Sequence, residues 1–131
     1  MRKSANGFTI IEVIFIATVV GIASIFFFIQ KQNMATVATD NSKKVAINSM
    51  YYGLEEVFYP ANGYYPQTIG SDNLKSVDPS LFTDPAGKLI NTSGSTYSYR
   101  PLNCTDNKCR GYTLQTTLEN ENDFIKTSRN N

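Results

Sequence analysis

The sequence predicts an α+β protein in which one long N-terminal helix packs on a small antiparallel β-sheet. Three observations lead to this fold class. An apolar segment of 22 residues lies near the N-terminus, and an amphipathic, proline-free segment follows it directly. Beyond Pro60, short segments that alternate apolar and polar residues are typical of β-strands. The chain has 131 residues, which is room for one small domain.

The first predicted element is a membrane-spanning helix over residues 8–29. In this segment 17 of 22 residues are apolar. A helix of that length spans roughly 33 Å, which matches the hydrocarbon core of a bilayer at ~30 Å. Because Arg2 and Lys3 precede the segment, we expect the N-terminus to stay in the cytoplasm and residues 30–131 to face outward.

Two simpler interpretations of this segment remain open. A secretory signal has a shorter apolar core followed by a small-residue cleavage site, and Ala35–Ala38 offers a passable one. The apolar core is too long for that interpretation, and it contains a carboxylate. A plain single-pass anchor fits the length but gives Glu12 no purpose.

Glu12 is the unusual residue of the apolar segment. A carboxylate at the centre of a spanning helix costs roughly 2.5–3.5 kcal/mol, and less near the helix end, so such a residue is by default a functional hypothesis. The alternative is that Glu12, one turn from the membrane edge, reaches lipid headgroups or is protonated.

The string Gly7-Phe8-Thr9-Ile10-Ile11-Glu12 follows a short basic leader. It resembles the processing site of type IV prepilins, with Ile10 in place of the usual Leu. The resemblance implies that prepilin peptidase cleaves after Gly7 on the cytoplasmic side, that residues 1–7 are lost, and that the new N-terminus at Phe8 is methylated. It also implies the type IV pilin fold.

The resemblance gives Glu12 a role in filament assembly. In the family's assembly scheme, this Glu pairs with the terminal amine of a neighbouring subunit, which here is Phe8. A buried carboxylate is tolerable when a positive charge meets it, and such a pair also sets the register of packed helices. The implied partners are further copies of this chain in a helical homopolymer, other pilins, prepilin peptidase, an assembly platform protein with its ATPase, and the lipid bilayer before assembly.

Gly21 is a predicted weak point in the helix. Glycine in a helix interior costs roughly 1 kcal/mol relative to alanine. Pilins often carry a Gly here and a Pro about eight residues later, with local unwinding between them. This sequence departs from that pattern, with Ile29 at the second position. The alternative is that a small residue permits close packing of helices.

Residues 30–59 are predicted to continue the same helix as an amphipathic half. No proline interrupts them, and we expect Pro60 to end the helix. Apolar residues recur at three- and four-residue steps and predict a stripe that packs on the head: Ile47, Met50, Tyr51, Leu54, Val57 and Phe58.

Residues 60–131 are predicted to form a β-rich head. Tyr97–Asn103 and Arg110–Glu119 are expected to pair as a hairpin whose tip is closed by a disulfide between Cys104 and Cys109. A disulfide requires an oxidising compartment, which agrees with an outward-facing head. The alternatives are two free thiols or a weak metal clip.

Composition argues against catalysis. The chain has no histidine, which excludes Ser-His and Cys-His nucleophile pairs and His-ligated metal sites. It shows no Gly-rich phosphate loop, and no basic patch that would suggest nucleic acid. Glu119, Glu121 and Asp123 could suit calcium, but their spacing matches no motif, and a solvated loop is the better interpretation. We expect no enzymatic activity, cofactor or metal.

The resemblance therefore implies a structural subunit of a type IV pilus. The chain would first be a single-pass protein of the cytoplasmic membrane and then part of a surface filament, with possible roles in adhesion or motility. Three alternatives stay open: a pseudopilin of a type II secretion or DNA-uptake machine, a minor or tip subunit with a binding surface, and a membrane-anchored enzyme. The last has the least support in the sequence.

Overall fold

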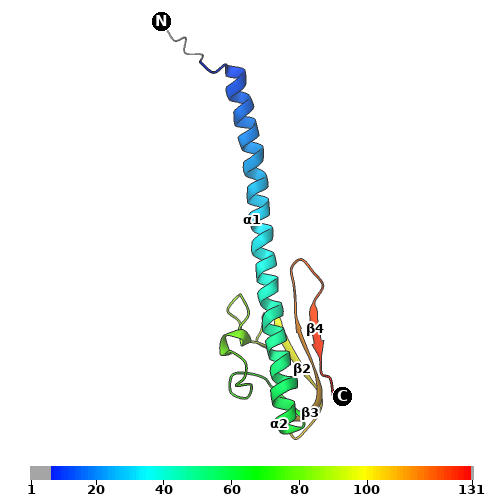
Figure 1. Ribbon diagram of the computed structural model, residues 1–131. Coiled ribbons are helices and arrows are strands. Elements are labelled where there is room, and N and C mark those ends of the chain that lie inside the picture. Colours follow the sequence, from blue (N-terminus) through cyan, green and yellow to red (C-terminus); the bar gives the residue numbers. More distant parts are fainter. Residues whose placement is uncertain (1–6, 131) are drawn as a thin grey trace. The chain divides into compact units, whose positions relative to one another are not determined.

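The computed structural model describes residues 7–130, and Figure 1 shows the order of the elements. Of the predicted leader, only Gly7 lies within these residues. The chain divides into two compact units, one ending at Ala35 and the other beginning at Thr36. Helix α1, Ile10–Tyr52, contributes to both. The predicted α+β arrangement, a long N-terminal helix with a small antiparallel sheet, is confirmed.

The helical backbone continues beyond Pro60, so the prediction that this proline ends the helix is wrong. A π-helical turn, η1 (Gly53–Phe58), and a short helix, α2 (Tyr59–Asn62), follow α1 without a break. Pro60 lies in the first turn of α2, directly after the π-helical turn, and the φ that its ring fixes is compatible with helical backbone. The end comes at Gly63, whose φ of 75° places it in the left-handed region that favours glycine.

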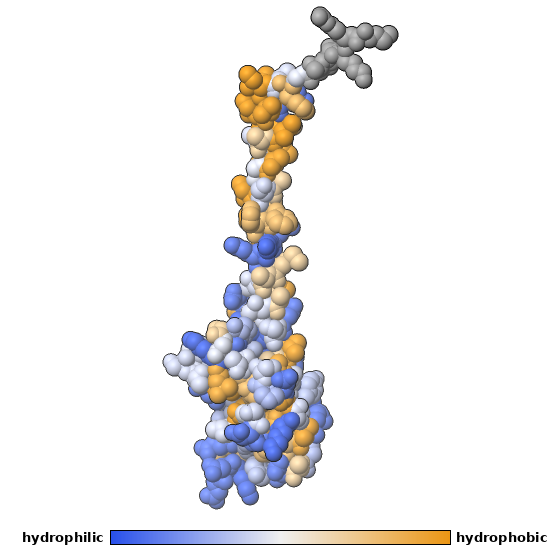
Figure 2. All heavy atoms as spheres, turned by 90° about the vertical axis from the view of Figure 1, so that its left-hand side faces the viewer, coloured by the Kyte–Doolittle hydropathy of each residue, from blue (hydrophilic) through white to orange (hydrophobic). Residues whose placement is uncertain are grey.

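Within the described residues, the first unit is an apolar helix whose side chains are exposed. Its large hydrophobic side chains are exposed all around the helix, and their exposed fractions range from 47% at Ile16 to 80% at Ile10. Figure 2 shows hydrophobic residues gathered over this segment. The helix is long and apolar enough to cross a membrane, and none of its most apolar stretch is buried, unlike the core helix of a soluble protein.

The sheet of the second unit is built around β3, Lys108–Thr116. This strand pairs antiparallel with β1 (Tyr65–Pro66), β2 (Tyr97–Thr105) and β4 (Phe124–Thr127). The predicted hairpin is present, but its strands extend closer to the tip and β3 ends before Glu119. Asp106 and Asn107 form the two-residue turn, both at positive φ. Asn and Asp tolerate this conformation better than other non-glycine residues, so a tight turn forms without glycine.

The core of the second unit lies between the helix and the inner face of the sheet. The buried apolar residues come from α1 and η1, from the loop before β2, and from the strands: Ala46, Ile47, Met50, Leu54, Tyr65, Ile69, Leu74, Val77, Phe82, Ile90, Tyr97, Tyr99, Cys109, Tyr112 and Leu114. The predicted helical stripe is therefore confirmed at Ile47, Met50 and Leu54. It is wrong at Val57, which is 53% exposed, because the wider π-helical turn changes which side chains face inward.

Candidate functional site

Thr9 caps the start of α1. Its hydroxyl accepts a hydrogen bond from the backbone N–H of Glu12 at 3.3 Å, and its carbonyl accepts from the N–H of Val13 at 3.1 Å. Threonine is a favoured residue at this position because its side chain satisfies an N–H that has no partner within the helix. The helix therefore begins at Ile10, the third residue after the predicted cleavage position.

Gly7 and Phe8 precede the helix and are exposed, Phe8 at 73%. Glu12 lies in the first helical turn and is also exposed. Its carboxylate has no hydrogen bond or ion pair to any residue that the structure describes, although the backbone of Glu12 is bound to Thr9. The carboxylate is thus available to a positive charge from outside the chain, and its place near the helix N-terminus is favourable for a negative charge.

Gly21 lies inside α1, and the helix is continuous through it. A Cβ built on Gly21 would meet no atom within 4 Å, so the chain itself does not require glycine there. The neighbouring hydroxyls are satisfied within the helix: Thr18 donates to the carbonyls of Ile14 and Phe15, and Ser24 donates to that of Val20. Polar side chains that bond back to their own helix are compatible with a lipid environment.

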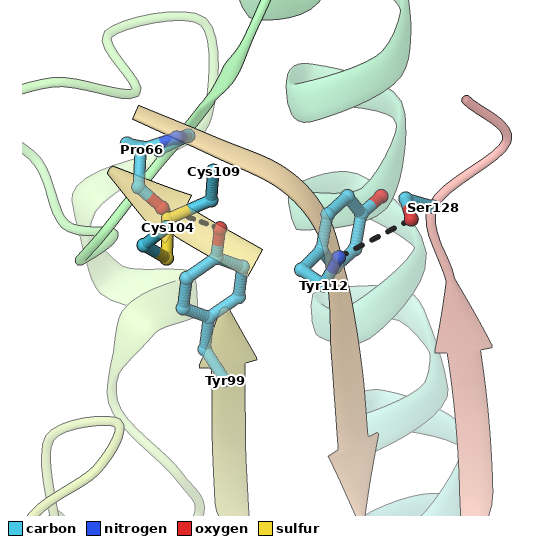
Figure 3. Close-up of a disulfide and its surroundings, with 6 residues drawn as sticks. All are labelled: Pro66, Tyr99, Cys104, Cys109, Tyr112 and Ser128. Atoms are coloured by element: carbon cyan, nitrogen blue, oxygen red, sulfur yellow. Dashed lines mark hydrogen bonds between the residues drawn. A yellow bond between two sulfur atoms is a disulfide. The ribbon is translucent and has the colours of Figure 1, made fainter. Parts of the chain in front are cut away.

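The predicted disulfide between Cys104 and Cys109 is present, and the structure contains no free cysteine. The two residues are direct cross-strand partners of β2 and β3. Figure 3 shows the disulfide near Tyr99, whose hydroxyl donates to the carbonyl of Pro66 at 2.7 Å. Closing so short a loop contributes about 2 kcal/mol in the chain-entropy model, and the bond fixes the tip of the hairpin.

A buried carboxylate, Glu55, is a feature that the sequence did not predict. It lies on η1 and is 5% exposed. It accepts hydrogen bonds from the hydroxyls of Tyr65 and Tyr112, at 3.0 and 2.8 Å, and from the backbone N–H of Arg129 at 3.2 Å. A buried carboxylate is stable when its oxygens are satisfied in this way. Glu55 therefore joins the helix, the sheet and the C-terminal segment.

The C-terminal segment is held on the helix by a second set of contacts. The guanidinium of Arg129 binds the carboxylate of Glu56 at 2.6 Å and donates to the hydroxyl of Tyr51 at 2.9 Å. The hydrogen bond to Tyr51 and then that to Glu56 raise the pKa of Arg129 above its usual range. In Figure 3, Ser128 accepts the backbone N–H of Tyr112. Together these contacts hold Ser128 and Arg129 against the helix and the sheet.

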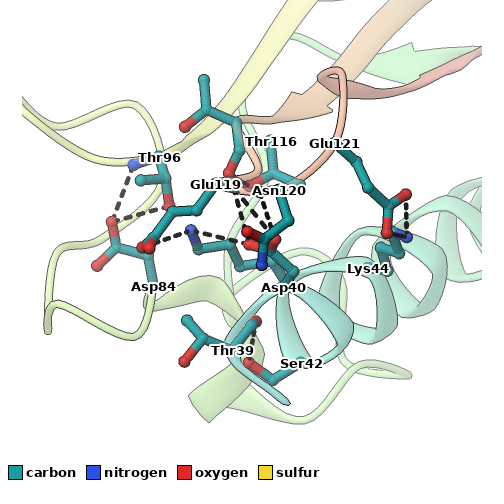
Figure 4. Close-up of polar contacts among 12 residues, drawn as sticks. Thr39, Asp40, Ser42, Lys44, Asp84, Thr96, Thr116, Glu119, Asn120 and Glu121 are labelled. Atoms are coloured by element: carbon teal, nitrogen blue, oxygen red, sulfur yellow. Dashed lines mark hydrogen bonds and ion pairs between the residues drawn. The ribbon is translucent and has the colours of Figure 1, made fainter. Parts of the chain in front are cut away.

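The acidic segment after β3 is an exposed loop, as expected, and its backbone contacts α1. Asp40 is buried and accepts the backbone N–H groups of Glu119 and Asn120 at 3.1 Å each. Burial alone would raise the pKa of Asp40, but these two amides and the ammonium of Lys43 at 3.7 Å together lower it. Figure 4 shows this arrangement. Within residues 7–130, no three acidic or cysteine side chains are grouped so that they could hold a metal ion.

An ion pair at Lys44 and a set of hydrogen bonds at Asp84 also hold loops of the head in place. Lys44 binds the carboxylate of Glu121 at 2.7 Å. Asp84 is buried in the loop before β2, where it accepts N–H groups of Ala86, Lys88 and Thr96. Figure 4 shows the contact between Asp84 and Thr96. Burial opposes ionisation of Asp84, yet the hydrogen bonds outweigh it, and the net effect lowers its pKa. Asp40 and Asp84 thus hold backbone segments in place through the N–H groups that they accept.

Comparisons of the chain with known protein families, with curated proteins and with solved structures each find no match.

Proposed function

We propose that this protein is a type IV pilin-like subunit, which is inserted in the membrane, cleaved after Gly7, methylated at Phe8 and polymerised through its apolar helix. The observation that carries the proposal is the exposed apolar helix, whose one carboxylate, Glu12, lies one turn from its start. The cleavage-type string directly before it resembles that of the prepilins. Filament subunits are the class of protein that needs all of these features together.

A charge pair explains why an apolar helix would carry a carboxylate at Glu12. A carboxylate in an apolar helix is costly unless a cation meets it. Cleavage after Gly7 creates an α-ammonium at Phe8, which methylation leaves cationic. In the proposed filament, Glu12 of one subunit meets the amine of Phe8 on a neighbouring subunit. Assembly then removes the penalty of both charges and sets the axial register.

The sheet of the head is poorly suited to polymerisation along the edge of β2, which favours the helix as the assembly element. The side chain of Asn91 bonds to both backbone groups of Tyr99, accepting at 2.8 Å and donating at 3.0 Å. The backbone N–H of Asn91 also donates to the carbonyl of Tyr97. Pro101 further along the strand has no N–H. Natural sheets protect edge strands from other chains by such devices.

The proposal also places the protein in the cell. The N-terminus stays inside, the head faces an oxidising outer compartment that maintains the disulfide, and the assembled subunit is part of a surface filament. Its partners are further copies of the chain, other pilins, prepilin peptidase and the platform protein and ATPase of an assembly machine. The driving force within a filament core is helix packing and charge pairing, because apolar helices already lie in an apolar solvent.

Mass spectrometry of material sheared from cells tests the proposal. We expect an abundant product that begins at N-methylated Phe8 and carries the Cys104–Cys109 disulfide. A matched control is the Gly7→Leu variant, which removes the small residue before the cleavage point and should leave a chain that begins at Met1 in the membrane. A processed product found only in membranes would instead indicate a pseudopilin, and an unprocessed native chain would refute the proposal.

A further inference from the structure

Two cavities adjoin at the end of the head, where α2 lies near the turn between β2 and β3. Figure 1 shows the position of α2 in the fold. One has a volume of about 760 Å³ and is lined by the helix end and the 67–76 loop. The other, of about 700 Å³, is lined by the hairpin tip and by Tyr59 and Asn130. Tyr64 is a wall of both. Each volume falls in the range of about 300–1,000 Å³ that is typical of ligand sites.

The walls of the two cavities carry an excess of positive charge. Lys75 lines the first cavity, and Lys108 and Arg110 line the second. Asp106 is the one carboxylate among the lining residues. None of the three cations forms a salt bridge with a residue that the structure describes. Cations without a salt-bridge partner among the described residues raise the positive potential in a hollow and favour an anionic ligand.

The same walls carry side-chain amides that have no partner of their own. Gln67 and Asn107 line the first cavity and Asn103 lines the second. Their side chains make no hydrogen bond to any other part of the chain that the structure describes, and all three residues are exposed. An amide offers both donors and acceptors, which is the combination that sugar hydroxyl groups require.

The aromatic rings of the site, Tyr64 and Tyr59, already pack against other side chains of the head. The ammonium of Lys108 lies over the ring of Tyr64, 5.2 Å from its centroid, and Phe58 packs against Tyr64 edge to face at 5.8 Å. Tyr59 is stacked on Tyr65 at 4.7 Å. Proteins that bind single-stranded nucleic acid rely on open aromatic faces on which bases stack. The site therefore favours a ligand recognised by charge and hydrogen bonds over a nucleobase.

We propose that the two cavities together bind a linear acidic polysaccharide. Its carboxylates meet Lys75 on one side of Tyr64 and the pair Lys108 and Arg110 on the other, and its hydroxyls bond to the unpartnered amides. Lys75 lines one cavity, and Lys108 and Arg110 line the other. A ligand of several sugar units can reach all three cations, whereas a single sugar would reach those of one cavity. This inference does not depend on filament assembly, since all the residues belong to one head.

The test is a calorimetric titration of the full-length protein in detergent micelles with an oligogalacturonate hexasaccharide. We expect binding by the unaltered protein and affinity reduced by at least about tenfold in the Lys108→Gln/Arg110→Gln variant, with a smaller loss for Lys75→Gln. Arg100→Gln is the matched control, because it removes an exposed arginine of β2 that lines neither cavity. Its affinity should stay within about twofold of the unaltered protein. Circular dichroism confirms that each variant is folded.

Neutral maltohexaose and oligothymidylate complete the experiment. We expect no measurable binding of the neutral sugar and weaker binding of the oligonucleotide than of the galacturonate. The proposal is overturned if galacturonate does not bind, if Arg100→Gln weakens binding as much as the double variant, or if maltohexaose binds equally well. Tighter binding of oligothymidylate would also overturn it, in favour of a nucleic-acid site.

Discussion

The hydroxyl of Tyr112 on β3 donates to the buried carboxylate of Glu55 on η1 across 2.8 Å. This contact crosses the core and joins residues that are 57 positions apart. Tyr65 and the backbone of Arg129 complete the set of donors around the same carboxylate. The head is thus held together at its centre by a polar group rather than by apolar packing alone.

Loss of this contact should destabilise the head. In Tyr112→Phe the carboxylate of Glu55 loses one donor but remains buried, which typically costs about 1–3 kcal/mol. We expect a comparable loss in Glu55→Gln, because an amide cannot accept from all three donors. Glu56→Gln is the matched control: its carboxylate is exposed and pairs with Arg129 at the surface, so the cost should be below about 1 kcal/mol. Urea unfolding measures all three, and equal effects at positions 55 and 56 would contradict the account.

Acid should unfold the head through Asp40 and Asp84. Their pKa values are lowered in the folded protein, despite burial, by the backbone amides that they accept. A carboxyl group with a lowered folded pKa stabilises the protein above its unfolded pKa of about 4, and this stabilisation is lost as the pH falls through the folded pKa. We therefore expect the melting temperature to fall steeply between pH ~4 and ~2.

The variants Asp40→Asn and Asp84→Asn should be less stable at neutral pH and should lose less on acidification. Asp72→Asn, which alters an exposed carboxylate of the 67–76 loop, serves as the control and should follow the unaltered protein. A melting temperature of the Asp40→Asn variant that falls as steeply as that of the unaltered chain would show that this carboxylate is not responsible.

Alkaline pH should ionise the core tyrosines only as the head unfolds. Burial, and then the charge of Asp84, raises the pKa of Tyr97 to about 12. Burial, followed by the neighbouring Glu55 and Tyr65, raises the pKa of Tyr112 further, and burial also raises that of Tyr99. Because these folded pKa values exceed the unfolded value of about 10, the stabilisation is complete below pH ~10 and is lost at higher pH.

Tyrosinate absorbance provides the measurement, since the chain has eight tyrosines and no tryptophan. We expect part of the signal to appear only when near-ultraviolet circular dichroism is lost, above pH ~12. In urea, all tyrosines should ionise together near pH ~10. A single transition near that pH in the folded protein, with its circular dichroism intact, would be inconsistent with this arrangement.

Replacement of Glu12 should block assembly without blocking cleavage. Removal of one partner of a buried ion pair typically costs about 3–5 kcal/mol, so we expect sheared filament material to fall by more than about tenfold in Glu12→Gln. The membrane fraction should still contain a chain that begins at Phe8. Glu121→Gln is the control, because it removes an exposed carboxylate of the head that pairs with Lys44. A normal filament yield from the Glu12→Gln chain would refute the role of this residue.

The sequence predicted those parts of the fold that depend on neighbouring residues. The buried positions Ile47, Met50 and Leu54 follow from helical spacing, and the Cys104–Cys109 pair follows from the two flanking strands. The end of the helix was missed because the helical backbone continues through Pro60, directly after a π-helical turn, and ends only at Gly63.

The polar core could not be predicted in the same way. A π-helical turn has no recognised residue pattern, so nothing in the string indicated that Glu55 would point inward. The partners of Asp40 lie 79 and 80 residues away along the chain, and no local pattern reports such a contact. Gly7, Phe8 and Glu12 act, in this account, on molecules other than their own chain, so their roles stay predictions.

Solid-state NMR of assembled filaments tests the pairing of Glu12 with Phe8 most directly. Filaments are grown from a mixture of two populations, one labelled with ¹³C at the Glu12 carboxyl and the other with ¹⁵N at the Phe8 amine. We predict a dipolar contact between these two nuclei at a separation of about 4 Å, with a carboxylate chemical shift that shows ionised Glu12. Well-ordered mixed filaments that give no such contact, or in which Glu12 is protonated, would contradict the account.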